Sequence, residues 1–478
     1  MWSVRASVCL VALCISAGCS SDDPQPTPTT AIEGTHALFD VDAEASFFAA
    51  PFPRPNRARD DGSLRVTDFP NPNGNVMVQQ MVDMLETGSQ GFSTNGAAYF
   101  PFSGALDEAT LPSSVEDSLR PESSVFLVNI DRSSPYYASR LGLEVQFKVA
   151  AETYSPSNVL VALPFQGFVL DPDTLYAFVV TSGVRAADGS ALGSALELEQ
   201  LKRGETPAAE AELPEARRLS AGFSALRAYY AEKQLDLSSI RAATVFRTGN
   251  ALIRHLRWRD QVAARPTPVA NDIADAGESY DDYCVVRASA ALPVFQTSTK
   301  PYATIGDGAM VEDGNGALVE QSLDNVEILL TVPKQPMPAA GYPMLLYGAG
   351  GGGKARQVID RTKESEDPDL GLGPRGQGPA LQLARRGVAS LGFPAPLAWE
   401  RNPAAKDGLV DFWNTGNLWA FRGNIQQGIV DFTTLIEWVK HIEIPGDLCP
   451  EASATTIRGR VPNELAHGLA LSDLGSAS

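Results

Sequence analysis

The chain has 478 residues, 44% of them hydrophobic, which is enough for two or three domains with packed cores and excludes a disordered protein. Its 57 Asp and Glu residues against 38 Lys and Arg give a formal net charge of −19. A surface of this sign repels polyphosphate, so nucleic acid is not expected as a partner.

The first residues have the pattern of an export signal. Arg5 lies in a short basic region, residues 8–15 are apolar, and the small residues 16–18 precede Cys19. This apolar stretch is too short to span a bilayer as a helix. We therefore expect residues 1–18 to be a signal peptide.

The sequence Ser-Ala-Gly-Cys at 16–19 resembles the lipobox of bacterial lipoproteins. The resemblance implies that Cys19 is acylated and anchors the mature chain to a membrane, whereas the alternative is plain cleavage and secretion. Ser20, rather than Asp after the cysteine, implies sorting to the outer membrane. Residues 19–35 are rich in Pro and Thr and are expected to form a tether.

Residues 36–265 are expected to form a β-rich N-terminal domain. A helix is predicted over residues 76–86, where apolar residues recur at helical spacing. Short apolar runs between turn signals then predict the strands of a β-sandwich-like module. These strands cover 124–130, 143–149, 158–164 and 175–184.

Two helices are predicted at the end of this domain, because the apolar period changes to three and four residues over 208–235 and 248–264. His255 in the second helix has no nucleophile near it in sequence and is interpreted as a surface or groove residue. The Pro-rich stretch from Pro266 to Pro268 marks the domain boundary.

Residues 266–478 are expected to form an α/β domain. Strands are predicted at 284–296 and 325–333, with hairpin turns between them. An apolar run at 344–347 enters a glycine-rich turn, and a helix at 378–387, a strand at 388–396 and a helix at 424–442 follow. We expect Ile425, Ile429, Phe432, Ile436 and Val439 to form the buried face of the last helix, with Gln426 and Thr433 on other faces. Alternation of this kind predicts a parallel, right-handed α/β unit.

The glycine-rich turn allows two chemistries. Gly348, Gly353 and Lys354 match the G-x-x-x-x-G-K of a phosphate-binding loop, but Ala355 stands where such a loop needs Ser or Thr for Mg²⁺. The favoured interpretation is an oxyanion loop after the third strand of an α/β-hydrolase, in which a backbone N–H points at an ester carbonyl oxygen. No nucleotide, metal or other cofactor is expected.

Of the five cysteines, Cys284 and Cys449 lie outside the predicted signal and lipidation site. In an oxidising compartment they form either a disulfide or two separate buried thiols, and sequence alone does not decide between these. They are too few for a metal site.

Most of residues 36–442 resembles secreted bacterial α/β-hydrolases of the lipase and esterase type that carry a virulence-factor-lipase-like β-rich module. The matching segments are 92–112, 170–192, 243–256, 330–353 and 417–439. The resemblance implies a Ser nucleophile, a His base and an acyl-enzyme. It also implies that Gly350 and Gly351 carry the oxyanion-facing amide. Such enzymes usually have His where this chain has Ala349.

The catalytic triad itself is missing from the sequence. No G-x-S-x-G occurs anywhere, and after Cys449 only His467-Gly468 and Ser472 are similar in residue type to the expected elements. We therefore expect an incomplete hydrolase sheet, truncated before the nucleophile elbow, with an exposed hydrophobic edge and a marginally stable C-terminal domain.

Two functions remain open at this point. The first is an exported lipoprotein of carboxylic-ester hydrolase type, inactive as this chain, with an ester or lipid substrate in a complete form. The second is a non-catalytic cell-surface lipoprotein whose β-rich domain binds a polymer or a protein. Both locate the chain in the cell envelope, at the outer membrane or secreted.

Overall fold

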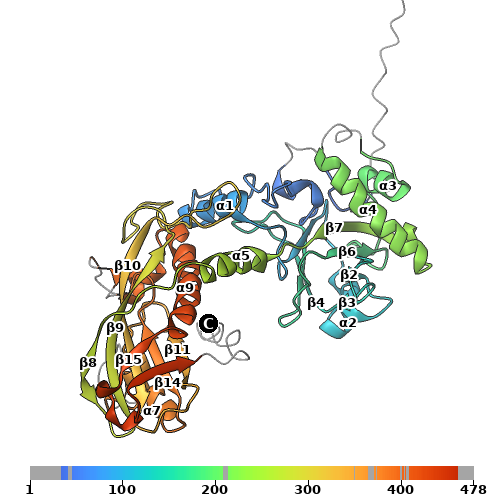
Figure 1. The fold of residues 1–478 in the computed structure, drawn as a ribbon. Coiled ribbons are helices and arrows are strands. Elements are labelled where there is room, and N and C mark those ends of the chain that lie inside the picture. Colours follow the sequence, from blue (N-terminus) through green and yellow to red (C-terminus); the bar gives the residue numbers. More distant parts are fainter. Residues whose placement is uncertain are drawn as a thin grey trace, which may run out of the picture.

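The computed structural model of the chain describes residues 34–40, 46–207, 214–348, 350–363, 371–372, 374–398, 401–402, 404 and 408–460. The chain forms two lobes, and the helices α1 (Val76–Gly88) and α5 (Ala251–Ala263) lie between them (Figure 1). In the part of the chain that is described, no sheet combines strands from before and after residue 265.

The N-terminal lobe contains two antiparallel sheets. The first has the order β1-β5-β4, from β1 (Ala98–Pro101), β4 (Leu143–Lys148) and β5 (Val159–Pro164). The second has the order β3-β2-β6-β7, from β2 (Val125–Asn129), β3 (Arg140–Leu141), β6 (Leu175–Thr181) and β7 (Ile240–Arg247). Phe100 of the first sheet and Phe178 and Phe246 of the second belong to one buried cluster. The two sheets thus share a core, as in a sandwich.

Helices cover the other face of the second sheet. The helices of this lobe and its junction are α1 (Val76–Gly88), α2 (Val115–Leu119), α3 (Leu196–Arg203), α4 (Pro214–Glu232) and α5 (Ala251–Ala263). Leu198 of α3 and Leu219 and Phe223 of α4 bury their side chains against Val179 and Val245 of the sheet. The lobe therefore has three layers, of which the helical layer was predicted only from 208 onward.

Among its described residues, the C-terminal lobe is built on one mixed sheet of seven strands, in the order β15-β16-β11-β14-β10-β9-β8. Its strands are β8 (Asn271–Ser279), β9 (Tyr283–Val294), β10 (Ser322–Pro333), β11 (Tyr342–Gly348), β14 (Ala389–Phe393), β15 (Glu443–Pro445) and β16 (Thr456–Arg460). Two strands of two residues each, β12 (Thr362–Lys363) and β13 (Gly371–Leu372), pair with each other in a separate small sheet. β11 is parallel to both of its neighbours, β14 and β16, while β8, β9, β10 and β15 are antiparallel to theirs.

Helices lie on both faces of this sheet, as a parallel centre requires. They are α6 (Gln357–Asp360), α7 (Pro379–Ala384), α8 (Gly408–Trp413) and α9 (Leu418–Val439). Leu435 and Trp438 of α9 pack on one face with Ile328 and Leu391, whereas α6 and α7 pack on the other with Val285 and Leu329. Six short 3₁₀ helices complete the described elements, at Phe47–Ala49, Pro55–Arg57, Glu108–Thr110, Leu237–Ser239, Gly446–Leu448 and Pro450–Ala452.

The buried face of α9 differs from the predicted one. Ile425, Ile429, Phe432 and Ile436 are only half-buried, whereas Gln427, Asp431 and Thr434 are buried. The reason is that α9 fills a polar niche: Gln427 accepts from Phe295 N–H and donates to the Pro293 carbonyl. The spacing of apolar residues does not predict such a face. The hydrogen bonds that offset the cost of burying these polar side chains come from segments remote in sequence.

The edges of the sheet also differ from the expectation of an exposed hydrophobic edge. β15 has three residues, of which Ile444 is buried and Pro445 lacks an N–H donor. β8 at the opposite edge carries Asp272, Asp275 and Glu278. Short length, Pro and charge are the devices that protect edge strands from pairing with other chains.

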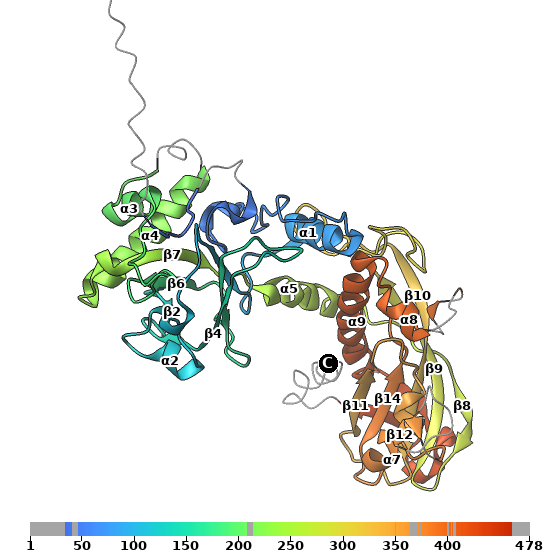
Figure 2. The same cartoon turned by 180° about the vertical axis from the view of Figure 1, so that it is seen from behind.

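The two lobes meet where α1 and α5 lie against α9 (Figure 2). Gln80 of α1 donates to the Gly416 carbonyl (3.2 Å) and accepts from the N–H of Leu418 (2.8 Å). Trp258 and Val262 of α5 are buried with Phe295 and Val430 of the C-terminal lobe. By its packing, α5 therefore belongs as much to the C-terminal lobe as to the N-terminal one.

Candidate functional site

The glycine-rich turn begins at the carboxyl end of β11, the central parallel strand. Gly348, the last residue of β11, pairs with Phe393 at the end of β14, so both strands finish at the same edge of the sheet. The turn that follows is closed by a hydrogen bond from Gly353 N–H to the Gly350 carbonyl (2.8 Å), and Gly352 has φ +76°. This is the edge at which open α/β sheets bind ligands.

Aromatic rings explain why side chains are absent from two of these positions. A Cβ at Gly348 would lie 2.1 Å from Cζ of Phe432 in α9, and one at Gly351 would lie 2.6 Å from Cδ1 of Phe412 in α8. A Cβ at Gly350, by contrast, would meet no atom within 4 Å. The chain at Gly351 is therefore packed beneath α8, whereas Gly350 has open space beside it.

The residues after the turn decide against the phosphate-loop interpretation on chemical grounds. Ala355 is buried with Val358 and Ile359 and offers no hydroxyl for Mg²⁺. The helix that follows, α6, has four residues, and Arg356, the residue directly before it, forms a bidentate pair with Glu278 (2.7 and 2.6 Å). The turn is thus anchored to the edge strand β8 by an ion pair.

β16 is the neighbour of β11 on the side away from β14. β16 pairs with only the first part of β11, Gly459 opposite Tyr342 and Arg460 opposite Pro343. The sequence between Thr456 and Ser472 contains no Ser, Thr or Cys. Residues 461–471, which follow β16 in the sequence, therefore contain no hydroxyl or thiol side chain.

A buried ion cluster lies near the same edge and was not predicted from the sequence. Arg401, which is 1% exposed, donates to Asp431 of α9, to Asp324 of β10 (2.7 Å) and to the Pro394 carbonyl. Lys300 also bonds to Asp324. Burial alone would lower the pKa of Arg401, but the attraction of Asp431 and Asp324 outweighs this cost and raises it. The four charged residues are separated by 24, 77 and 30 residues in sequence, so no local pattern indicates the cluster.

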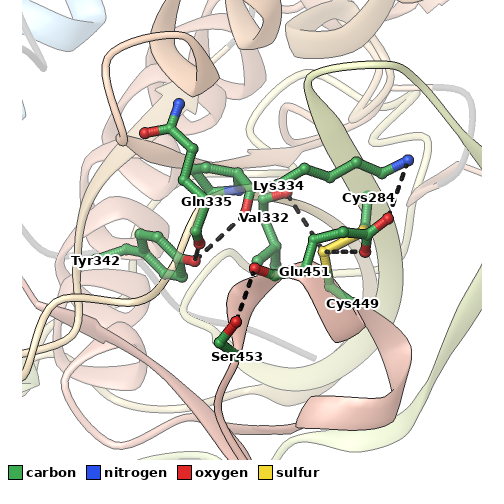
Figure 3. The surroundings of a disulfide bond; sticks show 9 residues. Cys284, Val332, Lys334, Gln335, Tyr342, Cys449, Glu451 and Ser453 are labelled. Carbon is green, nitrogen blue, oxygen red and sulfur yellow. Dashed lines mark hydrogen bonds and ion pairs between the residues drawn. A yellow bond between two sulfur atoms is a disulfide. The ribbon is translucent and has the colours of Figure 1, made fainter.

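Cys284 and Cys449 form a disulfide, one of the two outcomes that the sequence left open (Figure 3). It joins the beginning of β9 to the loop before β16, across 165 residues of sequence. Glu451 lies 3.8 Å and 3.9 Å from the two sulfur atoms and pairs with Lys334. Cys284, Cys449 and Glu451 are of the residue types that bind metal ions and lie close together. Both sulfur atoms are in the disulfide, however, so we interpret the cluster as structural.

Asp131 is a buried carboxylate of the N-terminal lobe whose oxygens are occupied by hydrogen-bond donors of the protein itself. Both carboxylate oxygens accept hydrogen bonds, one from Ser133 and the other from Arg247 (2.7 Å) and Leu175 N–H. Burial raises the pKa of Asp131, but these donors outweigh it and lower the pKa to about 2. The carboxylate therefore holds a turn together.

The other predicted site residues are distributed as follows. His255 lies on α5 with its Nδ1 3.1 Å from the Ala251 carbonyl and its ring against Trp258, away from the glycine turn. Cys19, Ala349, His467 and Ser472 lie outside the described residues.

Comparisons with known proteins add little. No family model and no curated protein matches the chain. A solved structure, the N-terminal part of the bacterial S-layer protein SbsC, aligns with 51% of this chain at 10% identity and a TM-score of 0.16. The alignment spans 38% of that S-layer chain, and a score this low does not establish a shared fold. Among the helices of the described residues, none has the length and apolarity needed to cross a bilayer.

Proposed function

We propose that the C-terminal lobe is of carboxylic-ester hydrolase type and that the glycine-rich turn is its oxyanion loop. The observation that carries this proposal is the position of the turn at the carboxyl end of β11, between two parallel neighbours. Backbone N–H groups at such a turn stabilise the negative charge of a tetrahedral intermediate, and one donor is worth about 10²–10³-fold in rate.

The order of the strands supports the same proposal. Numbered from β9 along the chain, the strands β9, β10, β11, β14 and β16 lie in the order 1-2-4-3-5, and the second is antiparallel to the others. This arrangement agrees with the first five strands of an α/β-hydrolase, in which the oxyanion loop follows strand three and the nucleophile follows strand five.

The proposed chemistry is incomplete in this chain. Gly350, with open space beside it, and Gly351 would face the substrate carbonyl oxygen. The sequence has no G-x-S-x-G, however, and residues 461–471, which follow β16, supply no hydroxyl or thiol to attack the carbonyl carbon. We therefore propose a chain that is inactive by itself. An ester or lipid is the substrate class of a form with a complete triad.

A fluorophosphonate probe tests the absence of a nucleophile. The protein from residue 20 on, shown to be folded by circular dichroism, is incubated with the probe and analysed by intact mass spectrometry. We expect no adduct. Stoichiometric labelling of one serine would show that a nucleophile exists and that the proposed inactivity is wrong.

A crystal structure tests the oxyanion loop separately. The proposal requires the N–H groups of Gly350 and Gly351 to point out of the sheet edge toward solvent. If both donate to carbonyl groups of the protein, the turn is only structural and the hydrolase assignment of the lobe loses its support.

The chain is further proposed to be a lipoprotein of the cell envelope, acylated at Cys19 and sorted to the outer membrane. The support is the order of basic, apolar and small residues before that cysteine. Metabolic labelling with an alkyne fatty acid should mark the wild-type chain and not Cys19→Ala. Labelling of both chains would contradict the assignment of the site.

The second candidate, binding through the N-terminal lobe, is favoured by one hollow in that lobe. A cavity of about 280 Å³ is lined by Phe47, Phe48, Pro70, Asp68 and Glu152, among others. A lining that combines apolar side chains with two carboxyl groups suits a polymer or peptide with apolar and basic or hydroxyl groups. A ligand lost on Phe48→Ala, in a protein that gives no probe adduct, would favour this function over the first.

A further inference from the structure

Arg422 is a cation that has no counterion in the described structure. It lies on α9, is half-buried, and its guanidinium carbon is 5.0 Å from the ring centre of Trp419. Among the residues that the structure describes, none forms a hydrogen bond or ion pair with it. Most half-buried arginines are paired, because desolvating a guanidinium without an anion is costly.

The surroundings of Arg422 are positively charged. Arg254 of α5 lies close enough to disfavour its charge, and burial and this neighbour together lower the pKa of Arg422. The nearby carboxylate, Glu312, is already shared by Arg254 (3.5 Å), Arg257 (3.6 Å) and the indole N–H of Trp258 (2.8 Å). The junction between the lobes therefore has an excess of positive charge in a chain of net charge −19.

Helix α1 ends beside Arg422 and carries a row of exposed apolar side chains. The end of α1 touches Arg422, since a Cβ at Gly88 would lie 3.0 Å from Nη1 of Arg422. Leu85, Met81 and Met77 precede Gly88 at spacings of three and four residues, so they share its face of the helix. Their exposed fractions are 43%, 51% and 43%. The stripe from Met77 to Gly88 is roughly 16 Å long at 1.5 Å per residue.

We propose that this junction binds an amphiphile with one anionic head group, a carboxylate or a phosphate, and a single alkyl chain. The head group pairs with Arg422 and the chain lies along Met77, Met81 and Leu85. Methionine suits such a role because its flexible thioether adapts to different chain positions. The site lies on α1 and α9 and does not include the glycine turn. The proposal is therefore independent of the hydrolase proposal.

The test is calorimetric titration of the protein from residue 20 on with laurate and with dodecyl phosphate, below the concentrations at which they aggregate. Saturable binding of either supports the proposal, and the tighter one identifies the head group. Acetate and inorganic phosphate should bind at least tenfold more weakly, because they lack the chain. Equal binding of dodecyltrimethylammonium would overturn the role of the cation.

Variants separate the two halves of the site. Arg422→Gln should weaken laurate or dodecyl phosphate about 10- to 100-fold, the range of a lost charged hydrogen bond, and Arg422→Lys should restore part of the affinity. Met81→Gln with Leu85→Gln should weaken the alkyl ligands and leave phosphate or acetate unchanged.

Arg259→Gln is the matched control, since Arg259 is a surface arginine of α5 that pairs with Asp260. It should bind as the wild type does. Melting curves verify that each variant is folded. Unchanged affinity in a folded Arg422→Gln protein would overturn the proposal, and so would an equal loss in Arg259→Gln.

Discussion

The two lobes hold their strands together by different means. In the N-terminal lobe both sheets are fully antiparallel, and aromatic rings such as Phe178 and Phe246 fill the space between them. In the C-terminal lobe the central strands are parallel, so each needs a crossover, and distant segments are joined by a disulfide and a buried ion cluster. The comparison indicates that the C-terminal lobe adds a disulfide and a buried ion cluster to its buried apolar clusters.

The tryptophans allow the two lobes to be followed separately. Apart from Trp2, every tryptophan lies at residue 258 or later, on α5 or in the C-terminal lobe. Tryptophan fluorescence in urea therefore reports the C-terminal lobe and its junction, and far-ultraviolet circular dichroism reports both lobes. The following predictions use this difference.

The largest effect is expected from removing the disulfide. The loop it closes spans 165 residues, for which the chain-entropy relation gives about 5 kcal/mol, an upper value for Cys284→Ala with Cys449→Ala. The tryptophan transition should move to lower urea, with the N-terminal transition unchanged. Equal shifts of both transitions would show that the lobes unfold as one unit.

The buried ion cluster should give the next largest effect. Arg401→Met leaves Asp431 buried without its cation, which costs about 3–5 kcal/mol in comparable pairs. Arg401→Met combined with Asp431→Leu should recover part of this loss, because no charge is then left buried. Urea melts followed by tryptophan fluorescence measure both. A double variant as unstable as the single one would contradict the assigned cause.

A smaller effect is expected at the contact between the lobes. Gln80→Leu removes both hydrogen bonds to the start of α9 and leaves the buried N–H of Leu418 without its partner, a cost of about 1–3 kcal/mol. The two unfolding transitions should separate further in this variant. Gln79→Leu, on the exposed side of α1, serves as the control and should change neither transition.

The smallest effect concerns acid and the N-terminal lobe. Because the folded pKa of Asp131 is about 2, below its unfolded value near 4, its contribution is full above pH 4 and is lost as the pH falls toward 2. Asp131→Asn should cost about 1 kcal/mol at pH 7 and flatten the loss of stability between pH 4 and 2. Circular dichroism melts over this range measure the slope. An unchanged slope would mean that other carboxyls carry it.

The local elements were predictable because their causes are local. The predicted strands 143–149 and 158–164 correspond to β4 and β5, and the predicted helices at 76–86 and 248–264 correspond to α1 and α5, each with boundaries within three residues. α3 and β8 were missed. α3 has eight residues and a mostly polar sequence, and β8 is an exposed acidic edge strand, so neither has the apolar period that was used.

The candidate site was predictable in part. An apolar run that enters six small residues and a lysine indicates a backbone ligand turn, and the turn does lie at the carboxyl end of a central strand. The reasons for its glycines were not visible, since Phe412 and Phe432 reach Gly351 and Gly348 from 61 and 84 residues away in sequence. The unpaired Arg422 was equally hidden, because a missing partner is a property of three dimensions.

The amino-acid sequence by itself determined the period of each long element, the position of the glycine turn and the absence of a G-x-S-x-G motif, because these depend on neighbours in the chain. Only the tertiary structure decided which cysteine outcome holds, which polar residues of α9 are buried and which arginine lacks an anion. Those properties depend on distances between segments that are remote in sequence, and side-chain burial and charge pairing are defined by such distances alone.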